Sequence, residues 1–261
     1  MDNFKEYGFC VKETFTKREL KNFEETFKDI LSMQMYKMRL EFSDDISRDV
    51  RLINAVNPDA LNEVMQMVRN TCEGHRLAAS RRLEEIGSEL LGNRNKVIIS
   101  GPSLFINIPS SNSRKYSWHS EQNWYPKRRN FINVWVPIIF DRLHETSMEV
   151  CIASHKKDWF YFSEYTGYAD KFDKDANVQY EIPDNLIRDY KEIIPDVKLN
   201  EALFFDGKLV HRSIDNVSDR VLFTVVFRMY DYSNDLTLSS NWADLPYNRK
   251  SLGYPNINVK I

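Results

Sequence analysis

Cysteine is scarce in this sequence of 261 residues, which contains only Cys10, Cys72 and Cys151. The three are odd in number and widely spaced, and no two form a Cys-x-x-Cys pair. This pattern argues against a disulfide framework and against a cysteine-based zinc ribbon. A reducing compartment is the simplest environment for such a chain, so we expect a cytoplasmic protein.

The sequence also lacks an excess of charge and a long apolar segment. Its 38 acidic and 36 basic residues leave a net charge of −2, so no overall field attracts nucleic acid or an anionic membrane. No segment approaches the roughly 18 apolar residues of a membrane span, and residues 1–6 lack the basic and apolar regions of a signal peptide. We therefore expect a soluble protein with no nucleic-acid partner and no membrane partner.

What the chain does contain is a helical front part and a β-rich back part. Hydrophobic residues make up 42% of the chain, enough for the core of one large domain over residues 1–261. Residues 1–95 are mainly helical: a strand over 4–11 is followed by a Thr16-x-x-Glu19 capping box, which predicts a helix to about Met35, and by a helical block over 57–91.

From residue 96 onward the pattern changes to short strands, which form a core over residues 96–232. They are predicted at 97–99, 104–108, 117–122, 131–139, 149–153, 202–206, 209–214 and 221–230. An insertion occupies about 156–195, and residues 233–261 form a C-terminal extension. The order of elements predicts an α+β fold in which helices cover one face of a barrel or jelly roll.

Two of the predicted strands have faces of different character. Ile132, Val134, Val136 and Ile138 are β-branched and suit packing against helices, whereas the alternate face carries Phe131, Asn133 and Trp135 and suits a cavity. The last strand sends Arg220 and Arg228 to one face. Because an unpaired buried charge is costly, that face requires an anion or a solvent-filled pocket.

The candidate site is the segment Trp118-His119-Ser120-Glu121, with His211 far downstream. Alternate side chains of a strand share a face, so His119 and Glu121 can reach one ion, and His211 in a second strand can supply the third ligand. Two imidazoles and one carboxylate are the facial triad of non-haem Fe(II) oxygenases. A lone histidine on a strand is more often structural. We reject His75, His144 and His155 as ligands because they lie in a helix, a charged loop and a turn.

Several segments resemble the phytanoyl-CoA dioxygenase family of Fe(II)/2-oxoglutarate oxygenases. They are Tyr7 to Val11 with the capped helix that follows, Trp118 to Glu121, Asn133 to Pro137, Met148 to Lys156, Phe204 to Ser213, and Asn216 with Ser218-Asp219-Arg220. The sequence departs from the family pattern where Glu121 stands in place of the more usual Asp and where Ile152-Ala153 replaces Pro-Gly. Arg220 also follows His211 after a shorter gap than is usual in the family.

The resemblance implies a double-stranded β-helix, also called a jelly-roll or cupin-like core, with Fe(II), 2-oxoglutarate and O2 as cofactor and co-substrates. The implied catalytic and metal residues are His119, Glu121 and His211.

Four residues are candidates for binding 2-oxoglutarate. Arg220 would receive its distal carboxylate, with Arg228 as the rival and a surface ion pair to Asp215 or Asp219 as the structural alternative. Ser213 shares a face with His211 and is equally well read as a turn serine. Asn107 and Trp135 lie on inward strand faces, and Asn107 serves as well to bond a neighbouring backbone group.

A cavity mouth is expected after the metal-ligand segment. Trp124, Tyr125 and the cations of 127–129 would lie there and select an anionic substrate, although three such cations are more often a solvated loop. The polar stretch 163–185 reads as a lid.

The predicted function is hydroxylation of an unactivated carbon in a small, polar or anionic metabolite, with release of succinate and CO2. Desaturation, epimerisation or cyclisation would use the same cofactors. The non-enzymatic alternative is a metal-binding jelly-roll module, which would have a fourth protein ligand and no inward arginine.

Overall fold

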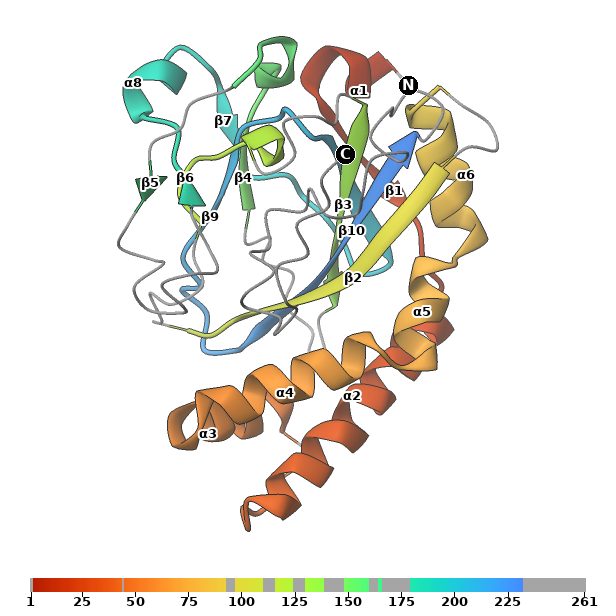
Figure 1. The fold of residues 1–261 in the computed structure, drawn as a ribbon, viewed down its shortest axis with the longest axis vertical. Helices are drawn as coiled ribbons and strands as arrows, with labels where there is room; N and C mark the ends of the chain where they lie inside the picture. The colour runs from red at the N-terminus through yellow and green to blue at the C-terminus, as the bar shows by residue number, and fades with distance from the viewer. Residues whose placement is uncertain are drawn as a thin grey trace, which may run out of the picture.

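Two antiparallel sheets of unequal size pack together, and the helices cover the outer face of the larger sheet (Figure 1). This arrangement is seen in a computed structural model that describes residues 2–43, 45–92, 97–109, 116–123, 130–138, 148–159, 164–165 and 179–231. The mixture of helices and antiparallel sheets confirms the predicted α+β class.

The N-terminal part is helical, as predicted. Its helices are α1 (Asp2–Tyr7), α2 (Lys17–Lys37), α3 (Ile46–Val56), α4 (Pro58–Arg69), α5 (Cys72–Ala78) and α6 (Arg81–Leu90). Thr16 caps α2 in a complete capping box with Glu19. The predicted block over 57–91 is divided into α4, α5 and α6, because new N-terminal caps begin at Thr71 and Ser80.

Two parts of the helical region differ from the sequence prediction. Residues 4–7, predicted as strand, belong to α1, which ends where Gly8 adopts a φ of 88°. Only then does the chain become extended, as β1 (Phe9–Glu13). Helix α3 was not predicted; its apolar residues Ile46, Val50 and Ile53 are buried at helical spacing.

The large sheet contains five strands in the order β1, β8 (Glu201–Asp206), β3 (Phe131–Ile138), β10 (Leu222–Asp231) and β2 (Val97–Asn107). Every neighbouring pair is antiparallel. The two runs predicted at 97–99 and 104–108 are one strand, β2. Gly101-Pro102, between those two runs, lies opposite a register shift between Val226 and Arg228.

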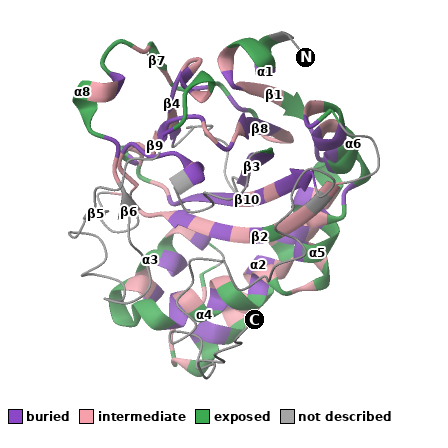
Figure 2. Ribbon diagram, turned by 45° about the horizontal axis from the view of Figure 1, so that its top comes forward, coloured by how far each residue is buried: buried purple, intermediate pink, exposed green. Residues whose placement is uncertain are grey.

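The faces of the large sheet are divided as the alternation predicted. Ile132, Val134, Val136 and Ile138 join the core formed with the helices, as do Phe223, Val225 and Phe227 of β10. The rings of Phe27 in α2 and Phe223 lie 5.1 Å apart in an edge-on contact. Figure 2 shows the buried residues of β2 and β10 above the helices. The opposite, inner face is therefore available to the site.

The small sheet packs against that inner face. It contains β7 (Glu192–Ile193), β4 (Met148–Cys151) and β9 (His211–Ser213), in that order. Met148 and Val150 form one apolar cluster with Trp135, Leu203 and Phe205 of the large sheet. The shorter elements are the 3-10 helices η1 (Glu121–Asn123) and η2 (Ser154–Lys156), the pair β5 (Glu164–Tyr165) and β6 (Gln179–Tyr180), and helix α8 (Asp184–Ile187).

No helix in the described part of the chain combines the length and the apolarity that crossing a bilayer requires.

The cap of α2 gives a test of the helical layer. Thr16→Ala removes the side-chain acceptor for the Glu19 amide and should lower stability by about 1 kcal/mol, or roughly 2–4 °C in Tm for a chain of this size. Ser80→Ala is the matched control, because Ser80 occupies the N-cap of α6 without a side-chain cap bond. Thermal unfolding that shows equal losses in both variants would contradict this role for Thr16.

Candidate metal centre

His119, Glu121 and His211 come together in the structure. One potential ligand atom from each lies within 4.8 Å of the others. Both histidines are buried, and Glu121 is partly buried. Among the described residues, this cluster contains no fourth histidine, cysteine, aspartate or glutamate. The donor set therefore fits a divalent ion held by two imidazoles and one carboxylate, with coordination positions left open.

Main-chain hydrogen bonds bring the two histidines together. The His119 amide donates to the His211 carbonyl at 3.0 Å, and the His211 amide donates to the His119 carbonyl at 2.9 Å. His211 pairs with Val150 of β4 on one side, so this isolated bridge adds His119 along the other edge of β9 in the small sheet. The imidazole rings consequently lie 4.1 Å apart.

Glu121 reaches the same place by a route that differs from the prediction. Residues 117–122 were predicted as a strand, but pairing stops after His119, and Glu121 begins the 3-10 helix η1. The turn is held by Gly207, whose carbonyl accepts from the Ser120 hydroxyl at 3.1 Å and from the Gln122 amide at 3.0 Å. The two side chains share a side because of this turn and not because of strand alternation.

Each imidazole is oriented by a backbone carbonyl. Nδ1 of His119 lies 2.6 Å from the Ser117 carbonyl, and Nδ1 of His211 lies 2.9 Å from the Leu209 carbonyl. A neutral ring that donates from Nδ1 presents the lone pair of Nε2 to a metal. Burial lowers the pKa of His119 to about 4 and that of His211 to about 3, so both rings are neutral at physiological pH.

Arg228 holds the carboxylate of Glu121. Its Nε and Nη2 both lie 3.0 Å from Oε2 of Glu121, while Oε1 lies 4.0 Å from Nε2 of His119. The Arg228 and Glu121 side chains are only 18% and 12% exposed. One carboxylate oxygen is therefore paired with arginine, and the other faces the histidines.

Arg228 was predicted only as a rival of Arg220 for 2-oxoglutarate, but in the structure it forms an ion pair with Glu121 of the triad. The sequence feature that pointed to this ion pair was that the last strand sends two arginines to one face. Asn133, whose side chain is buried beside Arg228, was noticed only as part of a mixed strand face.

Hydrogen bonds connect the chain segments that carry three of the four predicted 2-oxoglutarate residues, Asn107, Ser213 and Arg220. The Asn216 side-chain amide donates to the main-chain carbonyls of Asn107 at 2.9 Å and Arg220 at 2.6 Å. The Asn107 side chain donates to the carbonyl of Ile214, the residue after Ser213, at 3.4 Å. The Arg220 side chain is 40% exposed, and its Nε lies 3.9 Å from Oδ1 of Asp219.

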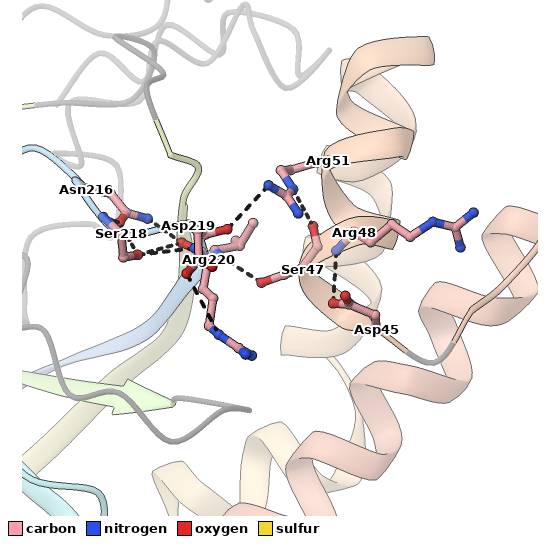
Figure 3. Close-up of polar contacts among 9 residues, drawn as sticks. Asp45, Ser47, Arg48, Arg51, Asn216, Ser218, Asp219 and Arg220 are labelled. Atoms are coloured by element: carbon pink, nitrogen blue, oxygen red, sulfur yellow. Dashed lines mark hydrogen bonds and ion pairs between the residues drawn. The ribbon is translucent and has the colours of Figure 1, made fainter.

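The backbone around Arg220 is also attached to α3, as Figure 3 shows. The Asp219 carbonyl accepts from Arg51 at 3.3 Å, and the Val221 amide donates to the Ser47 hydroxyl at 2.8 Å. Arg220 follows His211 closely in sequence, but β9 and β10 belong to different sheets, so no strand pairing brings Arg220 beside His211.

Trp135, the fourth predicted 2-oxoglutarate residue, lies buried on the inner face of β3. Its register partners are Leu203 in β8 and Val226 in β10. It belongs to the apolar cluster between the two sheets, which limits the access of water to this region.

The base of the predicted insertion packs beside the metal-ligand segment. The Ile182 amide donates to the Trp118 carbonyl at 2.6 Å, and Ile182 shares an apolar cluster with Trp118 and Trp159. Most of the predicted lid over 163–185 lies outside the described residues, as do Trp124, Tyr125, 127–129 and His144. His155 lies apart from the triad cluster, with Nε2 at 3.2 Å from the Lys5 carbonyl.

The geometry defines a class of site, namely the histidine, carboxylate and histidine centre of non-haem iron oxygenases. The chain belongs to the phytanoyl-CoA dioxygenase family, whose model matches residues 4–221. Membership confirms the predicted enzyme class, a 2-oxoglutarate-dependent non-haem iron dioxygenase, and with it the predicted Fe(II), 2-oxoglutarate and O2. No curated protein sequence matches the chain significantly.

Solved structures of low sequence identity share the fold. The carbocyclase SnoK from nogalamycin biosynthesis is 12% identical, with a TM-score of 0.59 over 92% of this chain and 89% of that one. EvdO2 from Micromonospora carbonacea var. aurantiaca, complexed with 2-oxoglutarate, is 11% identical, with a TM-score of 0.55 over 88% and 89%. The epimerase SnoN, in complex with Fe3+, alpha ketoglutarate and nogalamycin RO, is 11% identical, with a TM-score of 0.57 over 88% and 81%.

The lowered histidine pKa values predict how the metal-free protein responds to acid. The ordinary histidine pKa is 6.5, so between pH 6.5 and about 4 the unfolded chain binds protons that the native rings do not. The stabilising contribution of the neutral rings is complete above pH 6.5 and is lost as pH falls toward 4. Tm of metal-free protein should therefore fall between pH 7.5 and pH 5.

The variant that carries both His119→Gln and His211→Gln should have a flatter profile of Tm against pH. His75→Gln is the control, because His75 is exposed on α5. If the doubly substituted protein keeps the full pH dependence, other groups are responsible.

Proposed function

We propose that this protein hydroxylates an unactivated carbon of a small, polar or anionic metabolite, using Fe(II), 2-oxoglutarate and O2. The observation that carries the proposal is the buried cluster of His119, Glu121 and His211, with both rings oriented through Nδ1. In the balanced reaction one oxygen atom of O2 enters the substrate as a hydroxyl group. The other oxygen atom enters succinate, and the carboxylate lost from 2-oxoglutarate leaves as CO2.

We assign metal binding to Nε2 of both histidines and to Oε1 of Glu121. Bound Fe(II) would supply the redox chemistry that couples the decarboxylation of 2-oxoglutarate to oxidation of a C–H bond. Neutral imidazoles need not lose a proton before they bind a cation, which favours loading at neutral pH. Arg228 keeps Oε2 of Glu121 engaged and so leaves Oε1 directed toward the histidines.

We assign the distal carboxylate of 2-oxoglutarate to the connected segments that carry Asn107, Ser213 and Arg220. The Asn216 bonds to the carbonyls of Asn107 and Arg220 support this grouping. Trp135 would bound the co-substrate on its apolar side. Arg228 is already engaged by Glu121 beside the histidines, whereas Arg220 precedes the start of β10, so we assign the distal carboxylate to Arg220 and not to Arg228.

The proposed fold is a double-stranded β-helix in one domain, with residues 1–95 as the supporting helices. The two opposed antiparallel sheets and the helical cover on one of them support it. We place the enzyme in the cytoplasm, because Cys10, Cys72 and Cys151 are all unpaired. Its partner is a small-molecule substrate.

Cyclisation or epimerisation is the second candidate outcome, favoured by the structural likeness to a carbocyclase and an epimerase. These reactions use the same cofactors and differ from hydroxylation in how the substrate is placed. The fate of the substrate oxygen separates them, since only hydroxylation incorporates label from 18O2. A purely structural metal module is disfavoured by the inward Arg228 and by the three-residue cluster.

The triad assignment predicts the metal content of three variants. His119→Ala and His211→Ala should each abolish Fe(II) retention and 2-oxoglutarate turnover, because two remaining ligands do not hold the ion in place. Glu121→Ala should lose hydroxylation. Iron per chain, measured under anaerobic conditions, checks this, and iron content equal to wild type in both histidine variants would refute the assignment.

The two arginines should differ in their effect on 2-oxoglutarate. Loss of a charge-assisted pair to a carboxylate costs about 2–5 kcal/mol, so Arg220→Ala should raise the dissociation constant roughly thirtyfold or more. Arg228→Ala should leave that constant nearly unchanged at saturating Fe(II) and instead weaken iron binding and lower Tm, because Glu121 loses its partner. Anaerobic titration decides between them: if Arg228→Ala is the variant that loses 2-oxoglutarate affinity, the distal carboxylate must be reassigned.

A further inference from the structure

Asn133 is a buried asparagine whose hydrogen bonds are missing. Its side chain is 0% exposed, and neither Nδ2 nor Oδ1 has a hydrogen-bond partner. Leaving a buried amide unsatisfied costs about 1–3 kcal/mol, and a native structure rarely accepts that cost without a reason. A bound molecule that supplies the missing bonds would be such a reason.

Asn216 shows how a structural asparagine in the same protein behaves. It is also buried, but its Nδ2 donates to the carbonyls of Asn107 and Arg220, and its Oδ1 accepts from the Ser218 amide and hydroxyl. Asn216 therefore stabilises a turn, whereas the amide of Asn133 has no such bonds to the protein.

The strand register places Asn133 beside the triad. Its neighbours Ile132 and Val134 face the helices, so the Asn133 side chain faces inward. On one side its register partner is Arg228, which binds Glu121; on the other it is Phe205, whose ring centroid lies 4.7 Å from that of His211. The side chains of direct register partners are typically about 5 Å apart at Cβ.

This placement identifies the kind of molecule that Asn133 can meet. The histidines belong to the small sheet and its bridged neighbour, while Asn133 belongs to the large sheet that faces them. A molecule bound between these sheets beside the ligand atoms would therefore meet the inner face of the large sheet. Of the molecules in the proposed reaction, 2-oxoglutarate has an α-keto-acid end whose oxygens would bind the ion and would also accept hydrogen bonds.

We propose that Asn133 binds the α-keto-acid end of 2-oxoglutarate, with Nδ2 donating to the 1-carboxylate. The inference rests on the proposed function and adds a co-substrate contact distinct from the distal site of Asn107, Ser213 and Arg220. A neutral donor suits this position because the positive charge of the adjacent Arg228 is already paired with Glu121. The charge of the incoming carboxylate would be balanced mainly by the bound ion, so Asn133 needs only to donate a hydrogen bond.

Succinate separates the two ends of the co-substrate, because it keeps the distal carboxylate of 2-oxoglutarate and lacks the α-keto-acid group. Both ligands are titrated anaerobically by calorimetry into Fe(II)-loaded wild type, Asn133→Leu and Arg220→Ala. Loss of a hydrogen bond to a charged group predicts a rise of about tenfold or more in the 2-oxoglutarate dissociation constant of Asn133→Leu. Its succinate constant should change less than twofold, whereas Arg220→Ala should weaken both ligands.

Thermal unfolding of the ligand-free variants tests for a structural role. Asn133→Leu should keep or raise Tm, because it removes an unsatisfied buried amide, while Asn216→Leu should lower Tm by several degrees through loss of its observed bonds.

The inference is overturned if Asn133→Leu binds 2-oxoglutarate as wild type does, if it weakens succinate equally, or if it loses as much Tm as Asn216→Leu. Failure of wild-type protein to bind 2-oxoglutarate in the presence of Fe(II) is a different result, which overturns the proposed function itself.

Discussion

The pair of main-chain hydrogen bonds between His119 and His211 is the interaction on which the site depends. It joins a segment before β3 to the strand β9, and it places two imidazoles against each other in a buried position. The same ladder leaves the Ser117 and Leu209 carbonyls free to orient the rings. Because these bonds are formed by backbone, the position of both rings is determined by pairing of the sheet and not by side-chain packing alone.

The large sheet contributes the electrostatic half of the centre. Its outer face is apolar and is covered by the helices, while its inner face presents Arg228 and Asn133 toward the small sheet. Arg228 compensates the charge of Glu121 at a position where an isolated carboxylate would be costly. The protein thus separates stability from chemistry by strand alternation: one side of β3 and β10 builds the core, and the other builds the site.

Much of this arrangement was predictable from local pattern. The capping box at Thr16, the β-branched face from Ile132 to Ile138 and the division of β10 into two faces follow from periodicity, and the structure has them as predicted. The three metal-ligand candidates also come together. The prediction was wrong where the backbone leaves regular strand pairing. Glu121 begins a 3-10 helix in a turn held by the Gly207 carbonyl, and residues 4–7 form a helix that ends at the positive φ of Gly8. Hydrophobic periodicity does not detect a long-range backbone contact or a single turn residue.

The sequence by itself determined the residue types that a metal and a carboxylate require, and the alternation that directs them inward or outward. Tertiary structure alone decided which arginine meets Glu121, because that depends on the pairing of strands distant in the chain. β10 pairs with β3 and β2 and not with β9, so Arg228 lies at the triad while Arg220 lies near α3. Tertiary structure also decided that the Asn133 side chain has no hydrogen-bond partner in the described part of the protein. Whether a buried polar group finds a partner depends on the residues that the fold brings around it.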